Sequence, residues 1–440
     1  MKTLAAVILG KLIATISKTF KIGGGSAAPG LYALKIDPDL VGKLSRKIPQ
    51  NVVITGTNGK TTTARMLAHF AKIEGLKVIK NHTGSNLERG VTSTLVNSYS
   101  HISSGKVDLG IWELDEAAFN IVAPKIKPGV VLFLNVFRDQ LDRYGEVDSV
   151  VKRWCKTLTT LKSPTQILLN GDDANTRSLK KCFKGKVQLF GVKDYKIVGE
   201  AIEQQKEQEN YEFEAKNVKL HGLKGSYFHL QYSSLREANT FHLPVTLPLP
   251  GIYHIYDFLA AFAAGTRLGF SPTTMIKSLK HYSPAFGRME KFSLQPSRLH
   301  RKDGFIFLIK NPAGATQVFE TITPNLKPND RLLFALNDNI ADGRDVSWIW
   351  DAQWERLQET GYRLQVVASG TRAYDLANRL KYAGFDPKLI NIEQDLKKAF
   401  RQAKDGLKAR LFILPTYTAM LELQRILAKI GIKRHYWEEE

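Results

Sequence analysis

The sequence predicts an α/β protein with two lobes, the first built on a parallel sheet and the second Rossmann-like. At 440 residues the chain is too long for one ordinary domain. Short apolar runs alternate with helix-like segments, in the order "NVVITG", "KVIK", "VDLGIWEL", "GVVLFLN" and "TQILLN". This alternation is typical of a parallel sheet with helices on both faces. A second series, "GFIFLIKN", "RLLFALND", "YRLQVVASG" and "ARLFILP", predicts the second lobe.

The pattern divides the chain into an N-terminal helical segment at 1–46, a central domain at 47–295 and a C-terminal domain at 296–440. Between about 195 and 245, turn-rich segments such as "GSYFHLQYSS" predict antiparallel hairpins or an inserted subdomain. The run "IYDFLAAFAAGTRLG" then predicts a helix that ends at Gly269. A linker with Pro284 and Gly287 joins the two lobes, and a cleft between lobes is a common place for ligands.

The N-terminus imitates a signal peptide, because "TLAAVILGKLIATI" is followed by the small residues of "GSAAPG". Lys11 interrupts the apolar run, however, and Lys18 and Lys21 keep the spacing of an amphipathic helix. We therefore expect a helix that packs on the domain or touches a membrane surface. No stretch reaches the roughly 20 apolar residues that a membrane span needs.

The charge balance is strongly basic, with 63 Lys and Arg against 42 Asp and Glu and a formal net charge of +21. Such a balance favours an anionic partner, although a solvated basic surface explains it equally well. Nucleic acid is a poor candidate, since the chain has no arginine-rich tract or RNA-binding signature. The two cysteines, Cys155 and Cys182, lack metal-site spacing, and a reducing cytoplasm is the simplest compartment.

The segment "NVVITGTNGKTTTARML" predicts a strand, a glycine loop and a helix. A standard phosphate-binding loop, GxxxxGK[ST], would require glycine where this chain has Ile54. The placement still suits a nucleotide, because backbone N–H groups at a helix start bind phosphate and Lys60 adds a positive charge. An ordinary glycine turn is the alternative interpretation. The predicted nucleotide-binding residues of the loop are Gly56, Thr57, Asn58, Gly59, Lys60, Thr61 and Thr62.

Acidic residues follow the next predicted strands. "IWELDEAAF" places Glu113 at a strand end, where side chains of a parallel sheet face the nucleotide. We predict Glu113 and Thr61 as Mg²⁺ ligands and interpret Asp115 and Glu116 as a solvated acidic turn. "LNVFRDQLDRYG" offers further oxygen ligands at Asn135, Asp139 and Asp142.

In this order, "GTNGKTTT", the "GSN" at 84–86, "WELDE", "NVFRDQLDRYGE" and "LNGDD" resemble the Mur ligase family. Those enzymes use ATP to convert a carboxylate into an acyl phosphate, which an amine then attacks. Within the family the chain is most similar to the MurT branch, the ATP-dependent subunits of lipid II isoglutaminyl synthases. "KNPAG", "NDNIADGRDVSWIWD", "GTRAYDLANRLKYAG" and "PTYTAM" extend the resemblance over essentially the whole chain.

The resemblance implies a cytoplasmic enzyme, expected also at the inner membrane face, that uses ATP and Mg²⁺. It would amidate the α-carboxylate of D-glutamate in the stem peptide of lipid II, with ammonia from a GatD-type glutaminase. Lys60 and Glu113 would be catalytic. In the family, the acid of the "DGxDxSW" motif completes the partner's Cys-His pair, and Asp345 occupies that position. Without the resemblance, Asp345 would be interpreted as a helix cap. Lys310 would add positive charge or serve a structural role.

The chain departs from the family pattern in two places. Relatives commonly carry a four-cysteine zinc ribbon, but residues 195–235 contain no cysteine, so zinc is not expected. In "GIYHIYDFLAAF", His254 and Asp257 replace the usual asparagines that contact the base. Asn86 of the "GSN" segment is the remaining predicted nucleotide contact. Gln140 replaces a metal-linked histidine, which agrees with the MurT branch.

Two other functions fit part of the sequence. A ligase similar to folylpolyglutamate synthase would share the glycine loop and Glu113 but would need neither a glutaminase nor Asp345. A basic ATP-binding protein that acts on nucleic acid, or as a scaffold, is compatible with the charge of +21.

Overall fold

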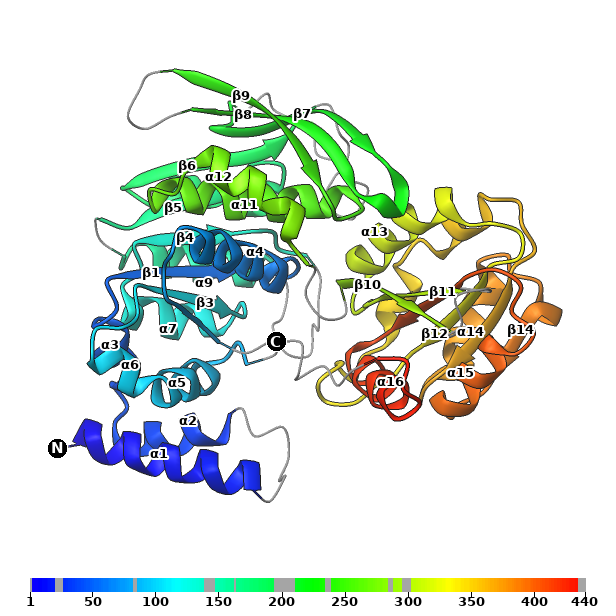
Figure 1. Cartoon of the computed structure of the whole chain (residues 1–440), viewed down its shortest axis with the longest axis horizontal. Coiled ribbons are helices and arrows are strands. Elements are labelled where there is room, and N and C mark those ends of the chain that lie inside the picture. The colour runs from blue at the N-terminus through cyan, green and yellow to red at the C-terminus, as the bar shows by residue number, and fades with distance from the viewer. Residues whose placement is uncertain are drawn as a thin grey trace.

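The computed structural model describes residues 2–19, 27–81, 85–137, 147–161, 164–193, 210–233, 239–283, 288–294 and 302–433. Two α/β lobes lie side by side, each with its own central sheet (Figure 1). This is the fold class that the sequence predicts.

The first lobe is built on a nine-stranded sheet in the order β2-β3-β1-β4-β5-β6-β7-β8-β9. Its strands are β1 Gln50–Thr55, β2 Val78–Lys80, β3 Leu109–Leu114, β4 Val130–Phe133, β5 Gln166–Asn170, β6 Lys186–Val192, β7 Phe213–Leu220, β8 Ser226–Ser233 and β9 Thr240–Leu247. The five predicted apolar runs form β1 to β5. Pairing is parallel from β2 to β7, and β8 and β9 are antiparallel. The predicted hairpins therefore extend the main sheet.

Helices cover both faces of this sheet, which explains why its strands are continuous apolar runs. On one face lie α4 Lys60–Ile73, α11 Ile252–Arg267 and α12 Pro272–Ser278, followed by η3 Leu279–His281. The other face carries α5 Glu88–Asn97, α6 Tyr99–Ser103, α7 Ala118–Ile126 and α9 Val147–Leu158, with α10 Ala174–Ser178 and η1 Leu179–Cys182 beside α9. A short turn, η2 Gly222–Lys224, joins β7 to β8.

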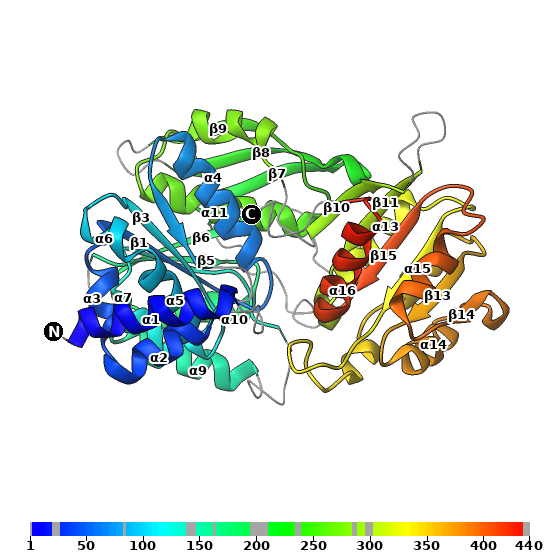
Figure 2. The same cartoon turned by 60° about the horizontal axis from the view of Figure 1, so that its bottom comes forward.

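The N-terminal segment is helical, as predicted, and consists of α1 Lys2–Thr19, α2 Ala28–Ile36 and α3 Leu40–Ser45. These helices add a layer outside α5 (Figures 1 and 2). Within the described part of the chain, no helix is both long and apolar enough to cross a membrane.

The second lobe has a six-stranded sheet in the order β10-β11-β15-β12-β13-β14. Its strands are β10 Arg288–Ser293, β11 Asp303–Phe307, β12 Arg331–Ala335, β13 Gln365–Ser369, β14 Ile390–Ile392 and β15 Leu411–Pro415. Only β10 is antiparallel to its neighbour. It joins this sheet although it precedes the expected boundary at 295/296.

Helices flank the second sheet as well, and the buried residues form a separate cluster on each face. The helices are α13 Pro312–Ile322, α14 Ala373–Tyr382, α15 Leu396–Lys404 and α16 Tyr417–Lys429. The 3-10 turns are η5 Thr323–Asn325, η6 Ser347–Trp350, η7 Trp354–Gln358 and η8 Pro387–Leu389.

The two cysteines are joined in a disulfide, which the sequence analysis did not predict. Cys155 lies on α9 and Cys182 on η1, and their Cα atoms are 5.2 Å apart. The spacing in the sequence contains no sign of this pairing, because only the packing of η1 against α9 brings the two side chains together.

Candidate functional site

The predicted order of strand, glycine loop and helix is present at residues 50–73. Gly56 and Gly59 both have positive φ, at 138° and 89°, which favours glycine. Gly59 lies at the N-cap of α4, and a Cβ there would come within 2.2 Å of Asp257 Oδ1. Backbone conformation and close packing therefore both require glycine at this position.

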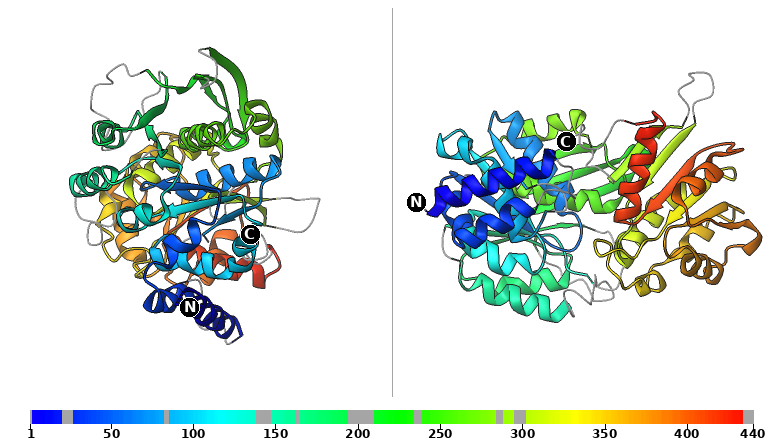
Figure 3. Two further views of the ribbon diagram at one scale, coloured as in Figure 1. Left: turned by 90° about the vertical axis from the view of Figure 1, so that its left-hand side faces the viewer. Right: turned by 90° about the horizontal axis from the view of Figure 1, so that it is seen from below.

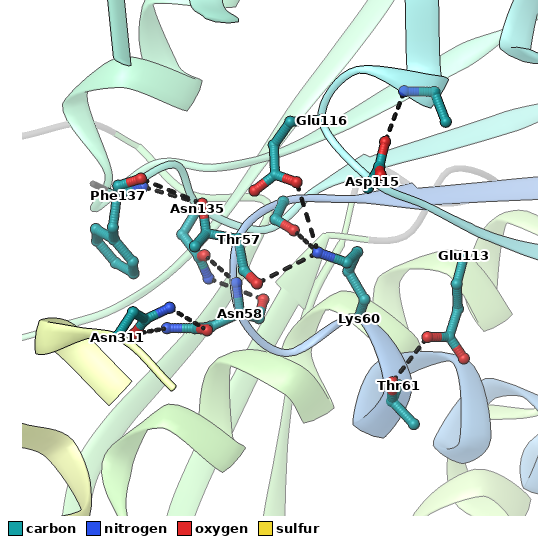
Figure 4. Close-up of polar contacts among 12 residues, drawn as sticks. Thr57, Asn58, Lys60, Thr61, Glu113, Asp115, Glu116, Asn135, Phe137 and Asn311 are labelled. Atoms are coloured by element: carbon teal, nitrogen blue, oxygen red, sulfur yellow. Dashed lines mark hydrogen bonds and ion pairs between the residues drawn. The ribbon is translucent and has the colours of Figure 1, made fainter. Parts of the chain in front are cut away.

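The loop is fixed to the end of β4 by Asn135. The Asn135 carbonyl accepts from Thr57 N at 3.0 Å, and its side-chain Oδ1 accepts from Asn58 N at 2.8 Å (Figure 4). Asn135 Nδ2 donates in turn to Asn58 O at 3.2 Å. The backbone of Phe137 also donates to Thr57 Oγ1 at 3.1 Å. These bonds hold the loop against the carboxyl edge of the sheet.

Lys60 begins α4 and folds back over the loop. Its Nζ donates to the carbonyl oxygens of Gly56 and Thr57 and lies 3.9 Å from Glu116 Oε2 (Figure 4). The ammonium group is thus held at the concave side of the glycine loop, where it can neutralise a bound anion.

Thr61 and Glu113, both predicted as Mg²⁺ ligands, are in contact with each other. Thr61 Oγ1 donates to Glu113 Oε2 at 2.8 Å, joining the first turn of α4 to the end of β3. Glu113 is buried, and its backbone N–H donates to Asn81 Oδ1 at 2.8 Å. A hydroxyl beside a carboxylate is the oxygen donor set that Mg²⁺ prefers, with phosphate and water completing the shell. The described residues contain no group of three or more His, Cys, Asp or Glu that could hold a metal alone.

The interpretation of Asp115 and Glu116 as a solvated acidic turn is wrong, because both are buried. Asp115 Oδ1 accepts from Ala118 N, the first residue of α7, at 2.7 Å. Glu116 faces Lys60 across the loop. The turn after β3 is covered by α7 and the glycine loop, and this tertiary packing removes it from solvent.

Asn86 lies beside this turn, where its carbonyl accepts from Asp115 N at 3.1 Å. Thr62, the last loop residue predicted to bind nucleotide, is buried in the first turn of α4. The predictions for Asp139, Gln140 and Asp142 lie outside the described residues.

His254 and Asp257 pair with each other at the start of α11. His254 Nδ1 lies 3.1 Å from Asp257 Oδ2, and both side chains are buried. Asp257 Oδ1 also accepts from Thr63 Oγ1 at 3.4 Å, which ties α11 to α4. The pair therefore lies next to Gly59 of the glycine loop and the first turn of α4.

A pocket opens between the lobes beside the glycine loop. Its lining includes Asn58, Gly59, Thr62, Asn135, His254 and Asp257 from the first lobe, and Phe307, Lys310, Gly314 and Gln317 from the second. Lys310 Nζ donates to Thr57 O at 3.1 Å. Two facing amides complete the contact: Asn58 Nδ2 donates to Asn311 Oδ1 at 3.2 Å, and Asn311 Nδ2 donates to Asn58 Oδ1 at 3.1 Å. The second lobe thus contacts the loop itself.

The "LNGDD" segment after β5 contributes residues that the sequence analysis did not assign. Asn170 Nδ2 donates to Leu134 O at 2.8 Å, and Asp173 accepts from Val136 N at 3.0 Å. Burial raises the pKa of Asp173 to about 6, although backbone N–H groups oppose the shift. Asp172 accepts from the hydroxyls of Tyr211 and Tyr256 at 2.7 and 2.6 Å. These bonds order the strand-end loops around the pocket.

The sequence also matches known protein families. A family model described as "MurT ligase C-terminal" matches residues 308–420, and one described as "Mur ligase middle domain" matches residues 54–265. The MurT subunit of lipid II isoglutaminyl synthase from Staphylococcus aureus is 30% identical over 96% of each chain. The chain belongs to the MurT family.

Solved structures with lower identity show the Mur ligase fold. MurF from Acinetobacter baumannii superposes with a TM-score of 0.69 at 16% identity, over 92% of this chain and 81% of that one. Mycobacterium tuberculosis folylpolyglutamate synthase, complexed with ADP, gives a TM-score of 0.65 at 15% identity, over 88% and 92%. This MurT family member therefore has the fold of these ligases.

Asp345, the acid expected to serve a MurT partner, does not line the pocket between the lobes. It is exposed on the second lobe, where its Oδ1 accepts from Ser347 N at 2.8 Å at the start of η6. This is a local turn contact two residues along the chain; the N-cap position of η6 is Val346. Because the side chain is exposed, the same carboxylate is also accessible to another protein.

Proposed function

We propose that this chain is the ATP-dependent subunit of a lipid II isoglutaminyl synthase. It would convert the α-carboxylate of D-glutamate in the stem peptide to an amide. The observation that supports this most directly is the cluster of Lys60, Thr61 and Glu113 at the glycine loop. The loop residues Asn58 and Gly59 line a pocket that the second lobe also lines. Its membership of the MurT family agrees with this reaction.

Activation of a carboxylate by ATP brings two anions together, so fixed positive charge is the main requirement. Lys60 lies inside the loop and Lys310 reaches it from the second lobe. The backbone N–H groups at the start of α4 add the positive end of the helix dipole. Thr61 and Glu113 would hold Mg²⁺, which when bound supplies charge neutralisation for the transferred phosphoryl group.

The proposed reaction has two steps. A carboxylate oxygen attacks the γ-phosphorus, the bond to the β-phosphate oxygen breaks, and ADP leaves. Ammonia then attacks the acyl carbon, phosphate leaves, and a proton is released as the amide forms. Residues of both lobes line the pocket, and its closure around the substrate would limit attack by water on the acyl phosphate.

The nitrogen source would be a GatD-type glutaminase that docks on the second lobe. Asp345 is exposed there, in the segment that also contains Ile340 and Trp350. Both apolar side chains are exposed, and the Trp350 ring lies 5.6 Å from the ring of Tyr382, which is exposed as well. Exposed aromatic side chains are enriched in protein interfaces. In such a complex, Asp345 would orient the partner's histidine.

Substitutions of Thr61 and Glu113 test the proposed Mg²⁺ site. We expect Glu113→Gln to raise the Mg²⁺ concentration for half-maximal activity by about tenfold or more, because a neutral amide binds the cation weakly. Thr61→Val should behave similarly, whereas Thr61→Ser keeps the hydroxyl and should retain most activity. The measurement is a Mg²⁺ titration of ATP-dependent amidation. An unchanged Mg²⁺ requirement in Glu113→Gln would refute this assignment.

The paired amides between the lobes predict a separate effect. Asn311 caps α13 through Gly314 N at 2.8 Å and also binds Asn58. Asn311→Asp keeps a capping oxygen but loses the Nδ2 donor to Asn58. Because this bond positions the glycine loop relative to the second lobe, kcat/KM for ATP should fall about tenfold, which corresponds to about 1.4 kcal/mol. Thermal melting should change little; normal kinetics with normal melting would show that the pair is dispensable.

The proposed reaction is tested by mixing the chain with ATP, Mg²⁺, lipid II and ammonium ions, without a glutaminase. Mass spectrometry should detect conversion of one carboxyl group to an amide. ATP hydrolysis without any amide product would contradict the proposal.

A further inference from the structure

The first helix carries an exposed apolar row. In α1, the side chains of Leu4, Ile8, Leu12 and Ile16 are 53%, 60%, 56% and 43% exposed. A spacing of four residues places them on one face of the helix. Exposed leucine and isoleucine are common singly, but a continuous row along a helix indicates a binding surface.

The opposite face fixes this helix to the first lobe. Ala6, Val7 and Gly10 are buried, and α1 contacts both α2 and α5. A Cβ at Gly10 would lie 2.9 Å from Val96 Cγ1 of α5, so the two helices approach closely. Figures 1 and 3 show α1 at the outer edge of the molecule, with α2 and α5 on its inner side. The apolar row is therefore held facing outward.

Within residues 1–36 the charge has one sign, and the next acid in the sequence, Asp37, is buried and paired with Lys43. Residues 1–36 contain lysines at positions 2, 11, 18, 21 and 35 and no aspartate or glutamate. At 3.6 residues per turn, Lys2 and Lys11 fall on opposite sides of the apolar row. The adjacent helix α2 also exposes Leu31 and Tyr32, and Lys35 Nζ lies 5.1 Å from the centre of the Tyr32 ring.

We propose that α1 docks the protein on an anionic lipid bilayer. The row Leu4, Ile8, Leu12 and Ile16 enters the boundary between headgroups and acyl chains, and the flanking lysines contact headgroup phosphates. Two copies of this chain would instead bring two sets of lysines together without any acidic partner from residues 1–36. An anionic bilayer satisfies both the apolar row and the positive charge.

Docking through α1 would place the lipid surface on the side of the first lobe where α5 lies. α1 packs on α5, which starts at Glu88. Two positions earlier is Asn86, whose carbonyl contacts the turn that follows β3. This orientation suits the lipid-linked acceptor of the proposed function. The docking itself does not depend on that function, because lipid binding needs neither ATP nor an acceptor.

The test is co-sedimentation of the full chain with vesicles. One set contains phosphatidylcholine with phosphatidylglycerol, and the other contains phosphatidylcholine alone. We expect at least tenfold tighter binding to the anionic vesicles, weakened by added salt. The double substitution Ile8→Ser and Leu12→Ser should reduce binding to anionic vesicles at least tenfold. Ile121→Ser, at a side chain 54% exposed on α7, is the matched control and should bind like the original chain.

A second variant tests the charge. Lys2→Gln with Lys11→Gln should weaken binding to anionic vesicles and leave binding to neutral vesicles unchanged. Melting temperatures should stay the same, because the substituted apolar side chains are exposed. No binding to anionic vesicles, or equal binding by the Ile8→Ser and Leu12→Ser variant, would overturn the proposal. The proposal would also be overturned if the original chain bound no vesicles but self-associated, and if the Ile8→Ser and Leu12→Ser variant did not. That result would identify a second copy of the chain as the partner of α1.

Discussion

Replacing Lys60 with alanine is expected to reduce ATP-dependent amidation by about 10³-fold, since one preorganised charge at the transferred phosphate has effects of this size. The Lys60 ammonium contacts the carbonyls of Gly56 and Thr57 within the glycine loop, and Glu116 lies 3.9 Å away. Its removal leaves the loop without its cation and Glu116 beside the phosphate position. Nucleotide affinity, measured by calorimetry, should fall together with the rate.

The control for this prediction is on the same helix. Lys72→Ala removes an exposed lysine near the end of α4 and should keep full activity. Circular dichroism should show that both variants keep their secondary structure. If the folded Lys60→Ala protein amidated at the original rate, the phosphate-binding role of the loop would be refuted.

Asp345→Asn should affect amidation with glutamine but not amidation with ammonium. In the complex with the glutaminase, we expect amidation with glutamine to fall by about 10²- to 10⁴-fold, because a neutral amide no longer orients the partner's histidine as a carboxylate does. Amidation with added ammonium should stay near the original rate, since Asp345 does not line the pocket beside the glycine loop. The measurement is amide formation with each nitrogen source under otherwise equal conditions.

Asp351→Asn provides a matched control, because Asp351 is also exposed and follows η6 directly. It should keep activity with glutamine. An Asp345→Asn complex that uses glutamine normally would contradict the proposed role. Loss of activity with ammonium as well would show that Asp345 acts in the ligase reaction or in folding.

Much of the first lobe was predictable from local patterns. A strand, a glycine loop and a helix follow each other within residues 50–73, so Lys60 and Thr61 could be placed from spacing alone. Glu113 could be placed too, because β1 and β3 pair in parallel and their carboxyl ends meet at one edge. Thr61 and Glu113 are in contact at that edge.

The remaining features depend on tertiary packing that the sequence does not display. Glu116 resembles a surface residue until α7 and the loop cover it. Asn311 binds Asn58 from 253 positions away, and no local pattern indicates which polar residue of the second lobe reaches the loop. Asn81 Oδ1 accepts from the backbone N–H of Glu113 at 2.8 Å. Asn81 follows β2, a strand of three residues that is too short to show a clear sequence pattern. Residues that support a site are harder to predict than those that form it.

The most direct test of the central claim is amidation of lipid II with ammonium, followed by mass spectrometry and fragmentation of the stem peptide. The proposed function predicts an amide at the α-carboxylate of D-glutamate, formed only with ATP and Mg²⁺ and in proportion to the ADP released. Addition of a further amino acid to the substrate, or no modification of lipid II under conditions where ATP is consumed, would contradict it.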